Sequence, residues 1–101
     1  MEENPTPRKT KRVPLQAHID FRRAGDHAYL VNILDISPEG CRIDLPERVK
    51  LDEVIWITLP GLESLQGRVC WVNEWTAGVE FVRPLYPAVF DMIAGRMQGG
   101  S

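Results

Sequence analysis

Apolar and polar residues alternate along much of the chain, and this alternation is typical of β-strands. From Val13 to Arg22 every second residue is apolar, which predicts a strand with one buried face. Turn residues such as Pro60-Gly61 and Asn73-Glu74 separate this segment from others with strand character. The further predicted strands are Ala28–Ile36, Cys41–Leu45, Val54–Leu59, Ser64–Asn73 and Trp75–Phe81.

The pattern changes its period after Pro84. Pro87 suits the first turn of a helix, and apolar residues recur at helical spacing through residues 87–97. Six short strands followed by one helix predict a mainly-β fold, a six-stranded antiparallel β-barrel with a C-terminal α-helix over an open end.

Length and composition indicate a single folded domain. The chain has 101 residues, of which 44% are hydrophobic, enough for one core. No apolar run approaches the roughly 18 residues of a membrane-spanning helix, and the N-terminus lacks an apolar signal-peptide core, so we expect a cytoplasmic protein without membrane insertion. The predicted organisation is a flexible tail (1–7), one domain (8–97) with a basic arm (8–12), barrel (13–82) and helix (87–97), and a flexible tail (98–101).

The cysteines, histidines and tryptophans offer few signs of chemistry. Two cysteines are too few for a disulfide-stapled domain, and both lie in predicted strands, where they are expected to be small buried residues. No paired metal-ligand spacing is present, so no metal site is predicted, and no nucleophile motif or phosphate loop suggests an enzyme or a cofactor. Core packing is expected for Trp56 and Trp71, and exposure for Trp75. The residues weighed for zinc were His18, His27, Cys41 and Cys70.

Positive charge is concentrated in one short segment, RKTKR, at residues 8–12 of a chain whose formal net charge is −2. A protein that binds long nucleic acids usually spreads its basic residues over a face. The local cluster favours a compact anion carrying a few phosphates, although a basic run near a terminus can also be a solvated tail.

A second notable segment is the turn DISPEG, at residues 35–40. Asp35 is expected at a strand end, where it need not be buried. Pro38 fixes its own φ, and Gly40 is free to take a positive φ or to let another group approach its backbone closely. The alternative is an ordinary tight turn in which Asp35 or Ser37 hydrogen-bonds its own backbone.

Together the two segments form the pattern RxxxR, a gap of 22 residues, and DxSxxG. This pattern resembles the signature of PilZ domains, bacterial receptors for cyclic di-GMP, and the segments RVCWV (68–72) and GVEF (78–81) are similar to the late strands of that family. The resemblance implies a split six-stranded barrel with a C-terminal helix. It assigns ligand binding to Arg8, Arg12, Asp35, Ser37 and Gly40.

The chemistry of the ligand suits these residue types. Cyclic di-GMP offers two phosphates and two guanines, and arginine can hold a phosphate or the guanine O6 and N7 atoms. By resemblance, Arg8 and Arg12 clamp phosphates and a guanine, Asp35 accepts from guanine N–H groups, Ser37 meets a phosphate or ribose oxygen, and Gly40 gives backbone clearance. Lys9 and Lys11 add accessory charge.

Because the arm precedes the first strand without a long linker, we expect a mechanism in which the mobile arm becomes ordered over the barrel when ligand binds and a downstream protein effector recognises the new surface. Many family members carry another arginine before RxxxR and bind two stacked ligand molecules. Here the position is Pro7, so we expect one ligand molecule per protomer. The expected oligomeric state is a monomer or weak dimer. Two alternatives stay open: a PilZ-like adapter that binds a protein without nucleotide, and a small barrel that binds RNA or DNA through its arm.

Overall fold

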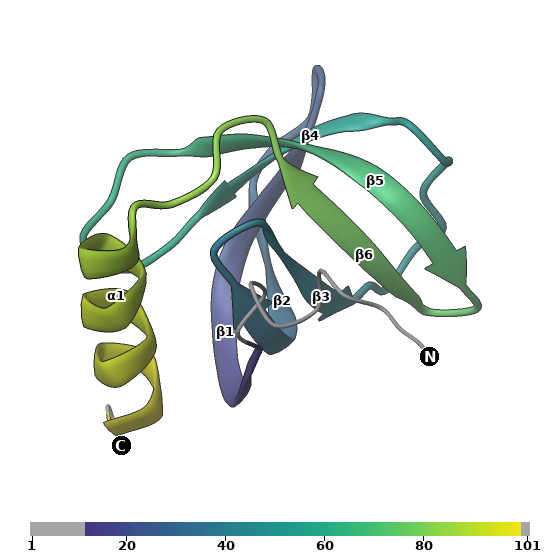
Figure 1. Ribbon diagram of the computed structural model, residues 1–101. Coiled ribbons are helices and arrows are strands. Elements are labelled where there is room, and N and C mark those ends of the chain that lie inside the picture. The colour runs from purple at the N-terminus through teal and green to yellow at the C-terminus, as the bar shows by residue number, and fades with distance from the viewer. Residues whose placement is uncertain (1–11, 100–101) are drawn as a thin grey trace, which may run out of the picture.

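The computed structural model describes residues 12–99, which form six strands and one helix (Figure 1). Each strand belongs to a predicted strand segment, with ends that differ by a few residues, and the helix begins at the predicted Pro87. The elements are β1 (Val13–Arg23), β2 (Tyr29–Ser37), β3 (Gly40–Asp44), β4 (Val54–Thr58), β5 (Leu65–Asn73), β6 (Thr76–Phe81) and α1 (Pro87–Gly99).

The strands close into an antiparallel barrel in the order β1-β2-β3-β6-β5-β4. This arrangement confirms the predicted six-stranded barrel with a C-terminal helix. The pairing of β1 with β2 spans Val13–Phe21, whereas the pairing of β1 with β4 spans Asp20–Arg23. Helix α1 packs against β1, beside the barrel (Figure 1).

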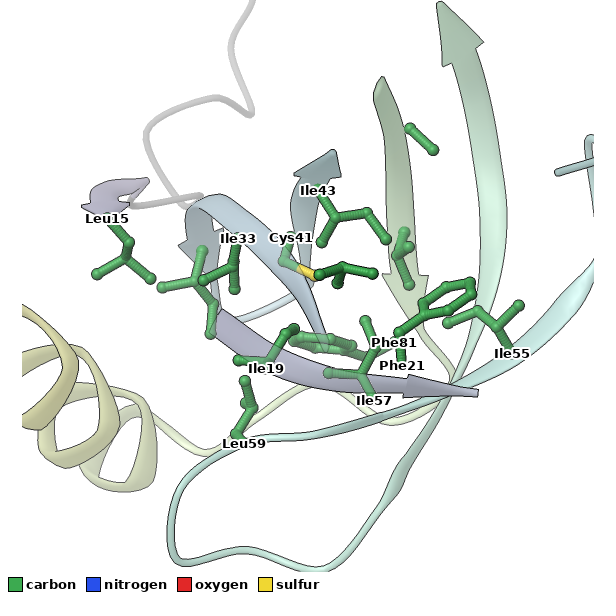
Figure 2. Packing of buried hydrophobic residues seen from close by; sticks show 14 of the residues in the cluster. Leu15, Ile19, Phe21, Ile33, Cys41, Ile43, Ile55, Ile57, Leu59 and Phe81 are labelled. Carbon is green, nitrogen blue, oxygen red and sulfur yellow. The ribbon is translucent and has the colours of Figure 1, made fainter. Parts of the chain in front are cut away.

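Alternate residues of the strands fill the barrel with apolar side chains (Figure 2). Phe21, Ile33, Ile43 and Ile57 have no solvent exposure, and burying each such side chain stabilises the fold by about 1.5–3 kcal/mol. Helix α1 adds to the same core through its apolar stripe, of which Phe90, Ile93 and Ala94 are buried. The period-two and period-3.6 patterns therefore meet in one core.

Irregularities in the strand pairing change which side chains face outward. In β2 the register shifts between Ile33 and Asp35, so Leu34 is an extra residue opposite β3. Asp35 consequently pairs with Arg42, between inward-facing pairs on either side. The bulge places an acidic and a basic side chain next to each other on the outside of the barrel.

A similar shift in β5 overturns two predictions. The register changes between Val69 and Trp71, which makes Cys70 the extra residue. Cys70 is exposed, not buried as expected, whereas Cys41 is buried as predicted. Trp71, expected on the inward face, is 37% exposed and lies outside the barrel opposite Gly78, because one inserted residue reverses the alternation.

The other tryptophans also lie outside the barrel. Trp56 was expected in the core, but it is half-buried on the outer face, where the Arg22 guanidinium lies 4.3 Å from its ring centroid. The apolar run of β4 hid the alternation that turns Ile55 and Ile57 inward and Trp56 outward. Trp75 is 52% exposed, as predicted.

Candidate ligand-binding site

The turn between β2 and β3 is closed by the hydroxyl group of Ser37. Its Oγ accepts hydrogen bonds from the N–H groups of Glu39 (3.3 Å) and Gly40 (3.2 Å) and lies 3.3 Å from the Gly40 carbonyl oxygen. Ser37 is fully buried. Its hydroxyl therefore serves as an internal cap that fixes the shape of the turn, as the ordinary-turn alternative expected of a serine in this place.

Gly40 allows β3 to approach β6 closely. A Cβ atom at this position would lie 2.0 Å from the carbonyl oxygen of Val79, a distance no real side chain adopts. Of the two roles predicted for Gly40, the structure supports close backbone approach. Two further hydrogen bonds fasten the turn, from Phe81 N to Glu39 O and from Leu85 N to Pro38 O, both 2.8 Å. The turn is thus held rigidly by β6 and the segment after it.

Asp35 joins the turn to the segment before β1. Arg12 Nη1 donates to Asp35 Oδ1 at 2.5 Å, across a sequence separation of 23 residues. On the other side, Arg42 Nη2 lies 3.0 Å from Asp35 Oδ2. The structure therefore brings together one arginine of RxxxR and the aspartate of DxSxxG, and it adds an arginine that belongs to neither motif.

The three charged groups differ in their access to solvent. The Asp35 side chain is 10% exposed, whereas those of Arg12 and Arg42 are each 48% exposed. Asp35 is more buried than expected for a strand end, because the β2 bulge sets it against the barrel and both arginines cover it. Two guanidinium groups around one carboxylate leave a net positive charge that can attract an anion.

Arg42 is the site residue that sequence reasoning missed. A signal was present, since Arg42 stands between the inward-facing Cys41 and Ile43 and so had to face outward. Its pairing with Asp35 depends on the extra residue in β2, which no sequence pattern marked.

The outer surface beside the charged cluster continues across the next strands. Arg42 pairs with Gly78, and Gly78 pairs with Trp71. The indole of Trp71 lies directly over Gly78, where a Cβ atom would come within 2.1 Å of the indole Nε1. Beneath the cluster, burial raises the pKa of the Cys41 thiol, and the negative charge of Asp35 raises it further. Cys41 is therefore an inert core residue below the site.

Several predicted site residues lie outside the described part of the chain. These are Arg8, Lys9 and Lys11, together with Pro7, on which the expected stoichiometry rests. Within residues 12–99, no group of three or more His, Cys, Asp or Glu side chains is arranged to hold a metal ion. The helix in this part of the chain lacks the length and apolar character needed to cross a membrane.

The structure is a mainly-β barrel with a cluster of charged side chains on its outer face, and comparison with known proteins names its family. The PilZ domain family model matches residues 6–93, so the chain belongs to the PilZ domain family, whose members are known as cyclic di-GMP receptor domains.

Among solved structures, the chain is similar to the PilZ domain of CeSA from a cellulose-synthesizing bacterium. The two share 17% sequence identity with a TM-score of 0.59, over 89% of this chain and 96% of that one. At this identity the likeness concerns the fold. No curated protein matches the sequence.

Proposed function

We propose that this protein is a cyclic di-GMP receptor in which the basic arm and the DxSxxG turn hold one ligand molecule between them. The observation that carries the proposal is the contact between Arg12 and Asp35, because it joins the two halves of the signature on the outside of the barrel. The functional conclusion follows from family membership together with this juxtaposition.

The proposed roles follow from charge and hydrogen-bonding capacity. Arg8 and Arg12 bind the phosphates or a guanine through charge-assisted hydrogen bonds. Asp35 accepts from guanine N1–H and N2–H₂, since an ionised carboxylate only accepts. Gly40 keeps the turn close to β6, which sets the position of Asp35.

Ser37 has a different part in this proposal from the direct ligand contact implied by the resemblance. Its hydroxyl is buried and hydrogen-bonded to the backbone of its own turn. We therefore assign Ser37 mainly to shaping the turn, and a contact with a phosphate or ribose oxygen stays a prediction.

Signal output is proposed to depend on the arm. Ligand bound by Arg8 and Asp35 together would fix the arm on the barrel and change the surface that a downstream protein effector meets. Hydrogen exchange of residues 8–12 with and without cyclic di-GMP tests this step. Unchanged exchange in the bound state would contradict it.

The decisive experiment is isothermal titration of the protein with cyclic di-GMP, GTP and single-stranded RNA. We expect saturable binding of cyclic di-GMP alone, at one molecule per protomer. Arg12→Ala and Asp35→Ala should each weaken it at least about 10-fold, because each removes charge-assisted hydrogen bonds.

Arg22→Ala is the matched control, because Arg22 contacts Trp56 near the opposite end of β1 and should leave affinity unchanged. RNA binding that depends on arm charge and tolerates Asp35→Ala would instead favour the nucleic-acid alternative. A folded protein silent towards every ligand would favour a protein adapter. Saturation at two molecules would refute the expected stoichiometry.

A further inference from the structure

Asp35 is held by two arginines that use different oxygens of its carboxylate. Arg12 binds Oδ1 and Arg42 binds Oδ2. Each oxygen of a carboxylate can accept about two hydrogen bonds, so both still have some accepting capacity. The two arginines nevertheless occupy both sides of the group that a guanine would approach.

The two arginines are anchored to the fold in different ways. Arg42 lies within β3, where it pairs with Asp35 on one neighbouring strand and with Gly78 on the other. Arg12 precedes the first residue of β1 and takes no part in the strand ladders of the described chain. Arg12 can therefore withdraw from Asp35 with little disturbance of the barrel, whereas the backbone of Arg42 cannot move away.

Ligand binding changes the charges around Asp35. When Arg12 turns towards a phosphate, Asp35 loses one of its two positive neighbours. A carboxylate only 10% exposed would then be left without a counter-ion, at a considerable cost in free energy, unless another cation stayed beside it.

We propose that Arg42 is a positioning residue for ligand binding: it holds the Asp35 carboxylate towards the guanine while Arg12 exchanges its contact with Asp35 for the ligand. This inference rests on the proposed function of the site. It gives Arg42 a role in recognising the base, through Asp35.

The test compares two ligands that differ in one contact to Asp35. Cyclic di-GMP offers both N1–H and N2–H₂, whereas its inosine analogue, cyclic di-IMP, lacks the exocyclic amino group. Arg42→Gln should bind cyclic di-GMP about 10-fold more weakly than the wild type. The affinity for the inosine analogue should fall less, so the ratio between the affinities for the guanine and inosine ligands becomes smaller in the variant. Arg42→Lys, which keeps the charge but loses the planar fork, should restore part of the affinity and of the preference.

Arg68→Gln is the matched control. Like Arg42, Arg68 lies in a strand and is ion-paired, and its side chain is 47% exposed, close to the 48% of Arg42. Arg68 bridges two carboxylates, those of Asp52 and Glu80. Its replacement should leave both affinities at the wild-type level. Circular dichroism and thermal unfolding establish that each variant is folded, and Arg42→Lys carries the test if the glutamine variant is not.

The possible failures can be told apart. If the wild type binds and Arg42→Gln binds equally well, the role of Arg42 is refuted and the receptor function stands. Equal losses for both ligands would mean that Arg42 only supports the local fold, which also refutes the positioning role. A wild type that binds neither ligand would overturn the receptor function and this inference with it.

Discussion

Asp35 and Glu53 are both carboxylates that face arginine, but the fold uses them differently. Glu53 is gripped by one arginine, with Arg23 Nε 2.6 Å from Oε2 and Arg23 Nη2 3.1 Å from Oε1, and it also accepts from the Lys50 N–H at 2.9 Å. Asp35 is shared between two arginines, one on each oxygen. The Arg23 and Glu53 side chains are 21% and 19% exposed, whereas both partners of Asp35 are half exposed.

The difference separates a structural ion pair from an exchangeable one. Glu53 accepts hydrogen bonds from Arg23 and from the Lys50 N–H, and these bonds connect the segment before β4 to the end of β1. Burial raises the pKa of Glu53, but the hydrogen bonds from Arg23 and the Lys50 N–H outweigh it and hold the pKa below its ordinary value. Asp35 instead has one partner, Arg12, that is half exposed, lies outside the strand ladders and can exchange its contact with Asp35 for a charged ligand.

The largest expected effect on stability comes from adding a side chain at Gly40, where β3 and β6 are in close contact. Gly40→Ala should lower the free energy of unfolding by more than about 3 kcal/mol, because the new Cβ would collide with the Val79 carbonyl. The control is Gly25→Ala, in the turn next to Arg23, where φ is +79° but nothing lies within 4 Å. It should cost about 1 kcal/mol. Urea denaturation measures both, and equal losses would show that close approach is unimportant.

Replacing Arg12 should mainly weaken ligand binding, whereas replacing Arg23 should mainly lower the free energy of unfolding. Arg12→Gln should weaken cyclic di-GMP binding at least about 10-fold while lowering unfolding free energy by less than about 1 kcal/mol, since its side chain is half exposed. Arg23→Gln should lower unfolding free energy by about 2 kcal/mol and leave binding unchanged. Titration and denaturation of both variants test the contrast, which fails if either variant changes both properties strongly.

Acid should reveal the structural carboxylate. The pKa of Glu53 is lower in the folded protein than its ordinary value of 4.5. The stability from its ionised form is therefore present above that value and is lost as pH falls through the lower folded pKa. The wild type should lose unfolding free energy as pH falls below the ordinary value of 4.5, and Glu53→Gln should lose less over the same pH range. A variant as acid-sensitive as the wild type would contradict this assignment.

The smallest effect is expected at the rim of the Glu53 region. The Tyr29 hydroxyl donates to Glu47 Oε2 at 2.6 Å in an exposed position, while its ring packs edge-on against Phe21 with centroids 5.6 Å apart. Tyr29→Phe keeps the ring and should cost less than about 1 kcal/mol. The control is Tyr86→Phe, because Tyr86 is 78% exposed. Thermal unfolding of both variants measures the difference in their stability. Glu47 also lies 3.3 Å from Arg23 Nη1, and a loss as large as that of Arg23→Gln would contradict the minor role given to the hydroxyl.

Regular alternation made most of the barrel predictable. Ala77, Val79 and Phe81 face inward as their spacing indicated, and the apolar spacing after Pro84 identified α1. The failures have two causes: the wholly apolar run of β4 hid the outward position of Trp56, and β5 contains an extra residue. Cys70 and Trp71 were misplaced because a bulge depends on how two strands fit together, which the sequence of one strand does not reveal.

Part of the site was also predictable from the sequence, and the part that was missed again depends on a bulge. Asp35, Ser37 and Gly40 stand in a recognisable motif, and Arg12 does contact Asp35. The burial of Asp35 and its pairing with Arg42 follow from the β2 bulge and needed the three-dimensional fold. Arg8, the other arginine of the motif, lies outside the described residues, and its role stays a prediction.

The short pairing between β1 and β4 has a consequence for how the protein behaves among its own copies. The pairing of β1 with β4 stops at Asp20 because its partner Thr58 is the last residue of β4, and α1 packs against β1. A strand left with unsatisfied backbone groups is a template for another chain, and natural proteins cover such edges. The C-terminal helix can therefore be regarded as a cover for this strand that opposes self-association, in addition to its place in the core. Recognition by another protein would then rely on side chains displayed on the barrel surface, without the addition of a strand.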